Sequence, residues 1–131
     1  MSSFLAKLEL DGESYTVLHC RYEFEKQIDS TNKPLSEVSG GKILLTLEST
    51  GKSNFIDWLL ANNKTKDGTI IFYRRDMMSR LQEIKFEKAY CVKLSEEFDA
   101  VNNNPMKISL TLIAKSLKFN AVSFVNDWIF V

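Results

Sequence analysis

The chain has 131 residues, of which 44% are hydrophobic, and its 17 basic and 17 acidic side chains give a net charge of zero. This length is typical of a single domain that can bury a core without metal or disulfide staples. The balanced charge excludes a general nucleic-acid binder, which needs excess positive charge against phosphate, and it leaves little net repulsion to oppose self-association.

The N-terminus predicts neither a signal peptide nor a membrane span. It reads MSSFLAKLELDG, without a basic segment before a long apolar run, and the chain lacks a stretch of about 18 apolar residues. We therefore expect a protein that is made and first used in the cytoplasm. Cys20 and Cys91 lie in strand-like segments whose spacing fits no zinc motif, so we expect buried thiols, with a disulfide or a reactive thiol as the alternatives.

Two strands are predicted before residue 26. Residues 4–10 alternate between apolar and polar, and the turn dipeptide Asp11-Gly12 follows them. A second alternating run covers residues 15–25 and gives a long strand whose two faces differ in polarity. We expect one face of this second strand to carry Leu18, Cys20, Tyr22 and Phe24, and the other His19, Arg21, Glu23 and Glu25.

The next segment, about residues 26–40, is polar, contains Pro34 and has no hydrophobic period. A connection of this length is uncommon in a compact domain and is often functional. It is predicted to be either a solvated loop or an arm that packs on a neighbouring subunit through Leu35 and Val38.

The middle of the chain predicts a strand followed by a helix. Ile43, Leu44, Leu45 and Leu47 form an apolar run of strand length, and after the break at residues 49–53 the period changes to about 3.6. The helix is expected over about residues 53–62, capped by Ser53 or Asn54, with Asp57 near the positive end of its dipole. Because it is apolar on most sides, through residues that include Phe55, Ile56, Trp58, Leu59 and Leu60, it must lie against a sheet.

Further strands are predicted in the second half of the chain. After a turn at Asp67-Gly68, residues 69–75 are apolar on both sides and should be covered on both faces. Residues 81–94 follow, with Lys88 on the apolar face, which indicates a bulge; that face holds Ile84, Phe86, Tyr90, Val92 and Leu94.

The last clear strand follows a turn cluster at Asn102–Pro105. Residues 106–115 alternate cleanly, and the apolar tail over about 117–131 should dock on this subunit or on another. The alternation opposes Met106, Ile108, Leu110, Leu112 and Ala114 to Lys107, Ser109, Thr111, Ile113 and Lys115.

These elements predict one mainly β domain over residues 1–131. Six or seven antiparallel strands with one short helix favour a small β-barrel or sandwich, with the helix packed outside it or over one end. The chemistry-bearing residues suggest no active site, since His19 is the single histidine and no phosphate loop or metal-ligand spacing is present. We expect no catalytic residues, no metal and no cofactor.

Several segments, taken in order, resemble the tube protein of type VI secretion systems, the haemolysin-coregulated protein family, in its Bacteroidetes form. The similarity runs from Phe4 to about Trp128 and rests on order and spacing, because none of the motifs is catalytic. It is carried by FLAKLELDG, YTVLHCRYEF, GGKILLTLEST, DWLL, KDGTIIFYRRDMMSRLQEIKFEKAYCV, EEFD and NPMKISLTLIA.

The resemblance implies a ring-forming β-barrel with a flanking helix. Hexameric rings would stack into a hollow tube inside a contractile sheath, assembled in the cytoplasm and expelled when the sheath contracts. The implied partners are further copies of the chain, the sheath, spike and baseplate proteins, and effector proteins in the lumen, with no nucleic acid and no membrane insertion.

Two sets of residues follow as hypotheses. Leu35, Val38 and Trp128 would contact other subunits, while Arg21, Glu23, Lys107, Ser109 and Thr111 would line the lumen. Three alternatives remain at this point: a monomeric ligand-binding barrel with a closed apolar cavity, an enzyme in which His19 meets a Ser, Cys or carboxylate, and a specialised tube paralogue that carries effectors.

Overall fold

The computed structural model describes residues 4–74, 76, 79–101 and 106–128. The predicted turn at Asn102–Pro105 and the last three residues of the tail lie outside the described residues. The elements, in chain order, are β1 (Phe4–Leu10), β2 (Glu13–Tyr22), β3 (Glu25–Ile28), β4 (Pro34–Ser39), β5 (Lys42–Glu48), α1 (Asn54–Leu60), β6 (Lys66–Arg74), β7 (Ser79–Glu97), β8 (Lys107–Phe119) and β9 (Val122–Val125).

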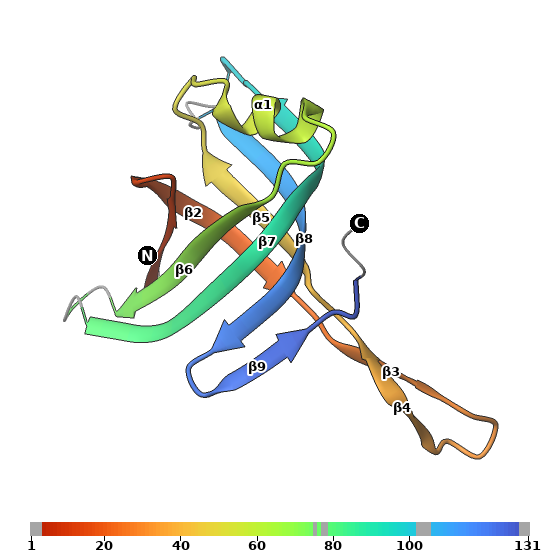
Figure 1. The fold of residues 1–131 in the computed structure, drawn as a ribbon. Coiled ribbons are helices and arrows are strands. Elements are labelled where there is room, and N and C mark those ends of the chain that lie inside the picture. Colours follow the sequence, from red (N-terminus) through yellow and green to blue (C-terminus); the bar gives the residue numbers. More distant parts are fainter. Residues whose placement is uncertain (1–3, 75, 77–78, 102–105, 129–131) are drawn as a thin grey trace.

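Six of these strands close into an antiparallel barrel (Figure 1), which confirms the predicted fold class. The sheet runs β5-β2-β1-β6-β7-β8, and a further pairing of β5 with β8 completes the circuit. β9 extends the sheet from β8, while β3 and β4 pair with each other in a separate two-stranded sheet. Closure pairs most of the strand edges that would otherwise be open to other chains, although parts of β2 and β7 still have a partner on one side only.

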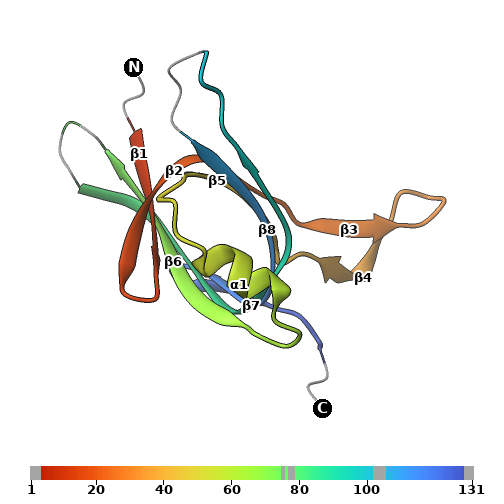
Figure 2. The same cartoon turned by 90° about the horizontal axis from the view of Figure 1, so that it is seen from above.

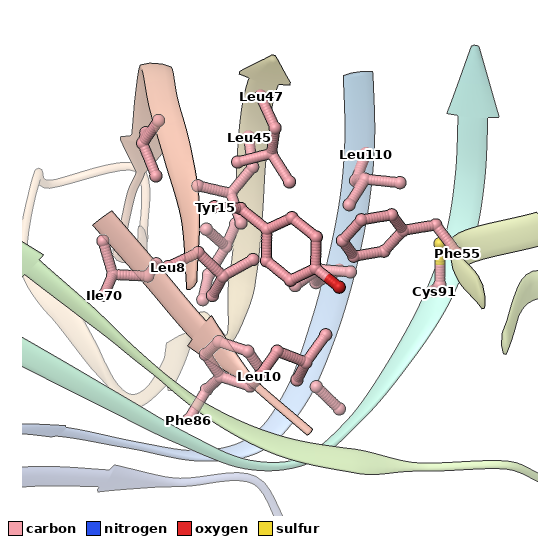
Figure 3. Close-up of a cluster of buried hydrophobic side chains, with 14 of the residues drawn as sticks. Leu8, Leu10, Tyr15, Leu45, Leu47, Phe55, Ile70, Phe86, Cys91 and Leu110 are labelled. Carbon is pink, nitrogen blue, oxygen red and sulfur yellow. The ribbon is translucent and has the colours of Figure 1, made fainter. Parts of the chain in front are cut away.

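The barrel interior is filled with apolar side chains from every barrel strand. Alternate residues point inward, so strands such as β5 bury Ile43, Leu45 and Leu47 and turn the residues between them outward. Figure 3 shows the rings of Tyr15 and Phe55 side by side within this cluster, and their centroids lie 5.0 Å apart. The core is therefore a packed interior.

A bulge in β2 corrects the predicted facing of one residue. Val17 pairs with Leu47 and His19 with Thr46, so Leu18 is an extra residue in the ladder and 42% of it is exposed. Beyond the bulge Cys20 packs against the core as predicted. Strict alternation placed Leu18 on that same face, and this was wrong because the bulge absorbs one residue.

Two bulges also change the inward face of β7. The predicted bulge at Lys88 is confirmed: its φ is 50° and the register against β6 shifts there. A second shift falls between Cys91 and Lys93. The inward residues beyond Lys88 are consequently Ala89 and Cys91, so the prediction that Tyr90 and Val92 face the core was wrong, whereas Ile84, Phe86 and Leu94 do pack there.

The predicted turn at Asp67-Gly68 is instead the start of β6. A β-carbon at Gly68 would lie 2.4 Å from the ring of Phe86, so glycine is needed here to make room for a core side chain. Asp67 accepts the backbone N–H of Lys88 at 2.8 Å and stabilises the bulge opposite. Both faces of β6 are covered as predicted, because Ile70 and Ile71 are each fully buried.

The helix α1 lies across one end of the barrel (Figures 1 and 2). It is shorter than predicted, and Ser53 occupies the N-cap position without the expected side-chain hydrogen bond. Asn54 instead donates to the hydroxyl of Tyr15 at 2.7 Å. Trp58 is buried and donates to the carbonyl of Lys64 at 3.1 Å, so the helix closes this end of the core.

The segment predicted as a loop or an arm forms a β-hairpin, β3–β4, that projects away from the barrel (Figure 2). Its tip is held by Asp29, whose carboxylate accepts the backbone N–H groups of Thr31 and Lys33 at 2.8 and 3.0 Å. The segment is therefore a hairpin and not a loop, although its described side chains are exposed to solvent, and its packing on a neighbouring subunit stays a prediction. We call residues 25–39 the arm.

Candidate functional site

The candidate site is the outward face of four adjoining strands, β2, β5, β8 and β7, which we call the wall. At each margin of the wall, the outermost strand continues beyond the point where its pairing with the next barrel strand ends. Among the described residues, β2 pairs with β1 over residues 13–17 and with β5 over 17–22, so residues 18–22 have one partner strand there. β7 pairs with β6 over residues 79–89 and with β8 over 84–97, so residues 90–97 also have one.

Hydrogen-bonded register places polar side chains of the wall in rows across the strands. His19 pairs with Thr46, Thr46 with Ser109, and Ser109 with Ser95. The hydroxyl oxygens of Thr46 and Ser109 lie 3.3 Å apart, so they share a hydrogen bond. The flanking rows are Arg21–Leu44–Thr111–Lys93 on one side and Glu48–Lys107–Glu97 on the other.

Four of the five residues predicted to line a lumen belong to this face, namely Arg21, Lys107, Ser109 and Thr111. Arg21 is exposed and pairs with the fifth, Glu23, at 3.1 Å, just beyond the end of β2. Their exposure in an assembly is not tested by a single chain, so their role as lumen residues stays a prediction.

The wall also contains polar residues that were not among the predicted lumen residues. Thr46, Lys93 and Ser95 line a shallow hollow of about 320 Å³ together with His19, Ser109 and Thr111, above Leu44, Leu45 and Leu110. The alternation of β5 could have identified Thr46. Lys93 and Ser95 lie beyond both bulges of β7, and because the two extra residues cancel, alternation from Glu83 and Lys85 places them on the outward face again.

Neither cysteine on the wall strands is a ready nucleophile. Burial raises the pKa of the Cys20 thiol to about 11, and burial does the same for Cys91. Both thiols are free; Cys91 is buried as expected, whereas Cys20 is only half-buried. Within the described part of the chain the imidazole of His19 makes no hydrogen bond, so the contact required by the enzyme alternative is not observed.

Of the predicted subunit contacts, two lie on the arm and one lies against the barrel. Leu35 and Val38 are 49% and 37% exposed on β4. Trp128 is half-buried, and its ring lies 5.8 Å from that of Tyr90 in the same chain. The tail thus docks on its own subunit, and whether Trp128 also meets another copy stays a prediction.

Large apolar side chains are exposed mainly at the two ends of the molecule. Near the helix end, Ile56 and Leu60 lie on α1, and Phe98 and Val101 follow β7. At the opposite end the arm and β9 expose Ile28, Leu35, Val38, Val122 and Val125. Exposed apolar patches commonly mark sites of protein contact, whereas the wall between these ends is mostly polar.

The described residues contain neither a membrane-spanning helix nor a metal-binding group of side chains. Within residues 4–74, 76, 79–101 and 106–128, no helix has the length and apolar character needed to cross a bilayer. In the same ranges, histidine, cysteine and carboxylate side chains form no group of three or more that could hold a metal ion.

A family model described as Hemolysin coregulated protein Hcp (TssD) matches residues 2–129. Comparison with curated proteins found no match. Among solved structures, Hcp1 from Flavobacterium johnsoniae is 33% identical, with a TM-score of 0.87 over 93% of this chain and 99% of that one.

Two more distant structures share the fold. Hcp1 from Salmonella typhimurium is 12% identical, with a TM-score of 0.73 over 90% of this chain and 86% of that one. A chain of the sheath–tube complex of an extracellular contractile injection system, PVC, is 21% identical, with a TM-score of 0.54 over 89% and 88% of the two chains.

Proposed function

Because the chain belongs to the haemolysin-coregulated protein (TssD) family, whose members are structural tube subunits of type VI secretion systems and not enzymes, we propose that it closes into hexameric rings. The rings stack into a hollow tube whose lumen is lined by the wall. Contraction of a surrounding sheath expels this tube together with effector proteins carried in its lumen.

One observation carries the proposal: the wall has an unpaired strand margin on each side. Within the part of the chain that the structure describes, residues 18–22 of β2 and 90–97 of β7 each lack a second partner strand. Unpaired margins present rows of free N–H and C=O groups that another strand can satisfy. Two different margins on one molecule make a head-to-tail contact, and such contacts close into a ring when the rotation allows it.

The dimensions fit a lumen that admits a small folded protein. With about six copies contributing four strands each, a spacing of roughly 4.8 Å and a tilt of about 40° give a circumference of roughly 150 Å. The diameter at the backbone is then roughly 48 Å. The polar rows of the wall suit a surface that faces water and cargo, with Arg21, Glu23, Lys107, Ser109 and Thr111 among its lining residues.

The two apolar ends suit contacts between stacked rings. Leu35 and Val38 of the arm project from one end, and Ile56 and Leu60 lie on the helix at the other. Burying exposed apolar side chains stabilises an interface by about 25 cal/mol per Å² of area removed from water. The arm therefore joins one ring to its neighbours.

The remaining partners follow from this role. The tube assembles in the cytoplasm, within sheath proteins and on baseplate proteins, with a spike protein at its tip. The distant fold relative comes from a sheath–tube complex, which supports the general arrangement. Neither nucleic acid nor membrane insertion is part of the proposal.

Cross-linking tests the ring contact directly. In a Cys20→Ala/Cys91→Ala background, we would introduce Arg21→Cys and Lys93→Cys, one at each margin of the wall, and add a bismaleimide with an arm of about 8 Å. Within one copy the two positions are three strand spacings apart, or roughly 14 Å.

Cross-links between copies should produce a series of bands on a denaturing gel, from the dimer up to the hexamer. Each single-cysteine variant serves as a control and should give no such series, because its reactive partner on the neighbouring copy is missing. A double variant that stays monomeric on a denaturing gel would contradict the proposed ring.

A further inference from the structure

The wall contains a positive group that its own subunit does not neutralise. Among the described residues Lys93 makes no ion pair, whereas Arg21 is paired with Glu23. Lys107 lies between Glu48 and Glu97 in the cross-strand register. Although the whole chain has no net charge, the side chains in the central part of the wall therefore carry a net positive charge.

Lys93 borders the shallow hollow, and the residues around it are hydrogen-bond donors. Thr46, Ser95, Ser109 and Thr111 supply hydroxyl groups, and the imidazole of His19 supplies ring nitrogens. No carboxylate lines this hollow. An ammonium group surrounded by several hydroxyl donors is suited to bind a carboxylate, which accepts hydrogen bonds. These hydrogen bonds are stronger when the donor is charged, as the ammonium group is.

We propose that the hollow formed by His19, Thr46, Lys93, Ser95, Ser109 and Thr111 receives carboxylate side chains on the surface of cargo proteins. The inference rests on the proposed function, because only a closed ring points the hollow of every copy at one cargo. A single exposed ion pair contributes about 0.2–1 kcal/mol, so one hollow binds weakly. Several hollows in one ring act together and retain the cargo through multivalency.

Nucleic acid is the competing ligand, and the wall fits it poorly. Binding to a phosphate backbone requires many uncompensated cations, whereas the hollow is lined by a single lysine, Lys93, and is flanked by an acidic row that holds Glu48 and Glu97. Protein carboxylates can approach the hollow one at a time, beside this acidic row. The wall therefore selects acidic protein surfaces and excludes polyphosphates.

The test uses the full chain assembled as rings. The probes are fluorescein-labelled peptides of twelve residues in which glycine alternates with glutamate, glutamine or lysine, together with oligothymidylate carrying the same charge as the glutamate peptide. Fluorescence anisotropy measures their binding at low and moderate salt. We expect the glutamate peptide to bind more tightly than the other three probes, and salt to weaken it.

Three variants locate the binding surface. Lys93→Glu should weaken binding of the glutamate peptide about tenfold, as several small losses add within one ring. Ser109→Asp, in the middle of the hollow and away from the strand margins, should do the same. Lys118→Glu makes the same charge change at an exposed β8 position outside the hollow and should leave binding unchanged.

Native mass spectrometry of each variant separates the two proposals. Rings that bind all peptides equally, bind oligothymidylate more tightly, or respond equally to Lys118→Glu and Lys93→Glu would overturn the inference while leaving the tube function intact. A wild-type chain that forms no rings would overturn the proposed function and this inference with it.

Discussion

The side-chain amide of Asn126 fills the space that a β-carbon at Gly41 would occupy, since the two would lie 2.5 Å apart. Asn126 donates to the carbonyls of Gly40 and Ala114 at 3.2 and 2.9 Å, and its own N–H reaches the carbonyl of Lys115 at 2.7 Å. The tail thereby ties the base of the arm to β8.

Replacing Gly41 should weaken the fold at this junction. Its φ of +93° is unfavourable for any residue with a β-carbon, and the added atom would also lie 2.7 Å from the carbonyl oxygen of Ala114. We expect Gly41→Ala to lower the free energy of unfolding by about 2–4 kcal/mol in urea titrations. Gly51→Ala is the matched control, because its φ is +77° but nothing lies within 4 Å. Equal losses for both variants would contradict the steric role of Asn126.

Gly68 should be coupled to Phe86. Gly68→Ala would push its new methyl group into the Phe86 ring, at a cost of about 1–3 kcal/mol from overpacking. Phe86→Leu alone leaves unfilled volume in the core and also destabilises the barrel. In the double variant the smaller side chain gives the methyl group room, so the combined loss should be less than the sum. Strict additivity in urea titrations would show that the two residues do not compete for space.

Charged substitutions on the arm should weaken stacking while the barrel remains folded. Leu35→Asp and Val38→Asp each remove an exposed apolar side chain, so their effect on the isolated subunit should stay within about 0.5 kcal/mol. Negative-stain microscopy should show fewer or shorter tubes. Gln27→Asp adds the same charge at an exposed polar position of the arm and serves as the control. Tubes of wild-type length in both apolar variants would exclude the arm from stacking.

The tip of the arm should loosen in acid. The hydroxyl of Thr31, then the backbone N–H groups of Lys33 and Thr31, hold the pKa of the Asp29 carboxyl below its ordinary 3.8. A lowered pKa means that the ionised form stabilises the folded tip above pH 3.8, and this contribution is lost as the pH falls through the lowered value.

Amide resonances of Thr31 and Lys33 would report this titration by NMR. Their midpoint should lie below pH 3.8, and Asp29→Asn should abolish the pH dependence because asparagine does not titrate. A midpoint at or above 3.8 would show that the hydrogen bonds at the tip do not form in solution.

Alternation predicted most barrel strands because each has one face in the core, as in β5 and β8. It failed where the ladder gains a residue, at Leu18 and beyond Lys88, because a bulge reverses the facing without a clear signal in composition. Asp67-Gly68 was misassigned because a glycine that makes room for an aromatic ring resembles a turn glycine. The arm was missed as a hairpin because its strands are exposed on both faces and have no hydrophobic period.

The candidate site was predictable in part. Ser109 and Thr111 follow from the alternation of one regular strand, so their common face could be inferred. Lys93 and Ser95 keep the outward position that alternation gives them, because the two bulges of β7 cancel, but the strands that lie beside them depend on the pairing within the closed barrel. The unpaired margins of the wall depend on where neighbouring strands diverge, which is a property of the closed barrel and not of any single segment.

Native mass spectrometry of the purified full chain, with negative-stain imaging of the same sample, tests the central claim most directly. The account predicts a dominant hexamer that appears as six-fold rings with an open centre, some of them stacked. A chain that remains monomeric at high concentration, or assembles into dimers without a central opening, would contradict it.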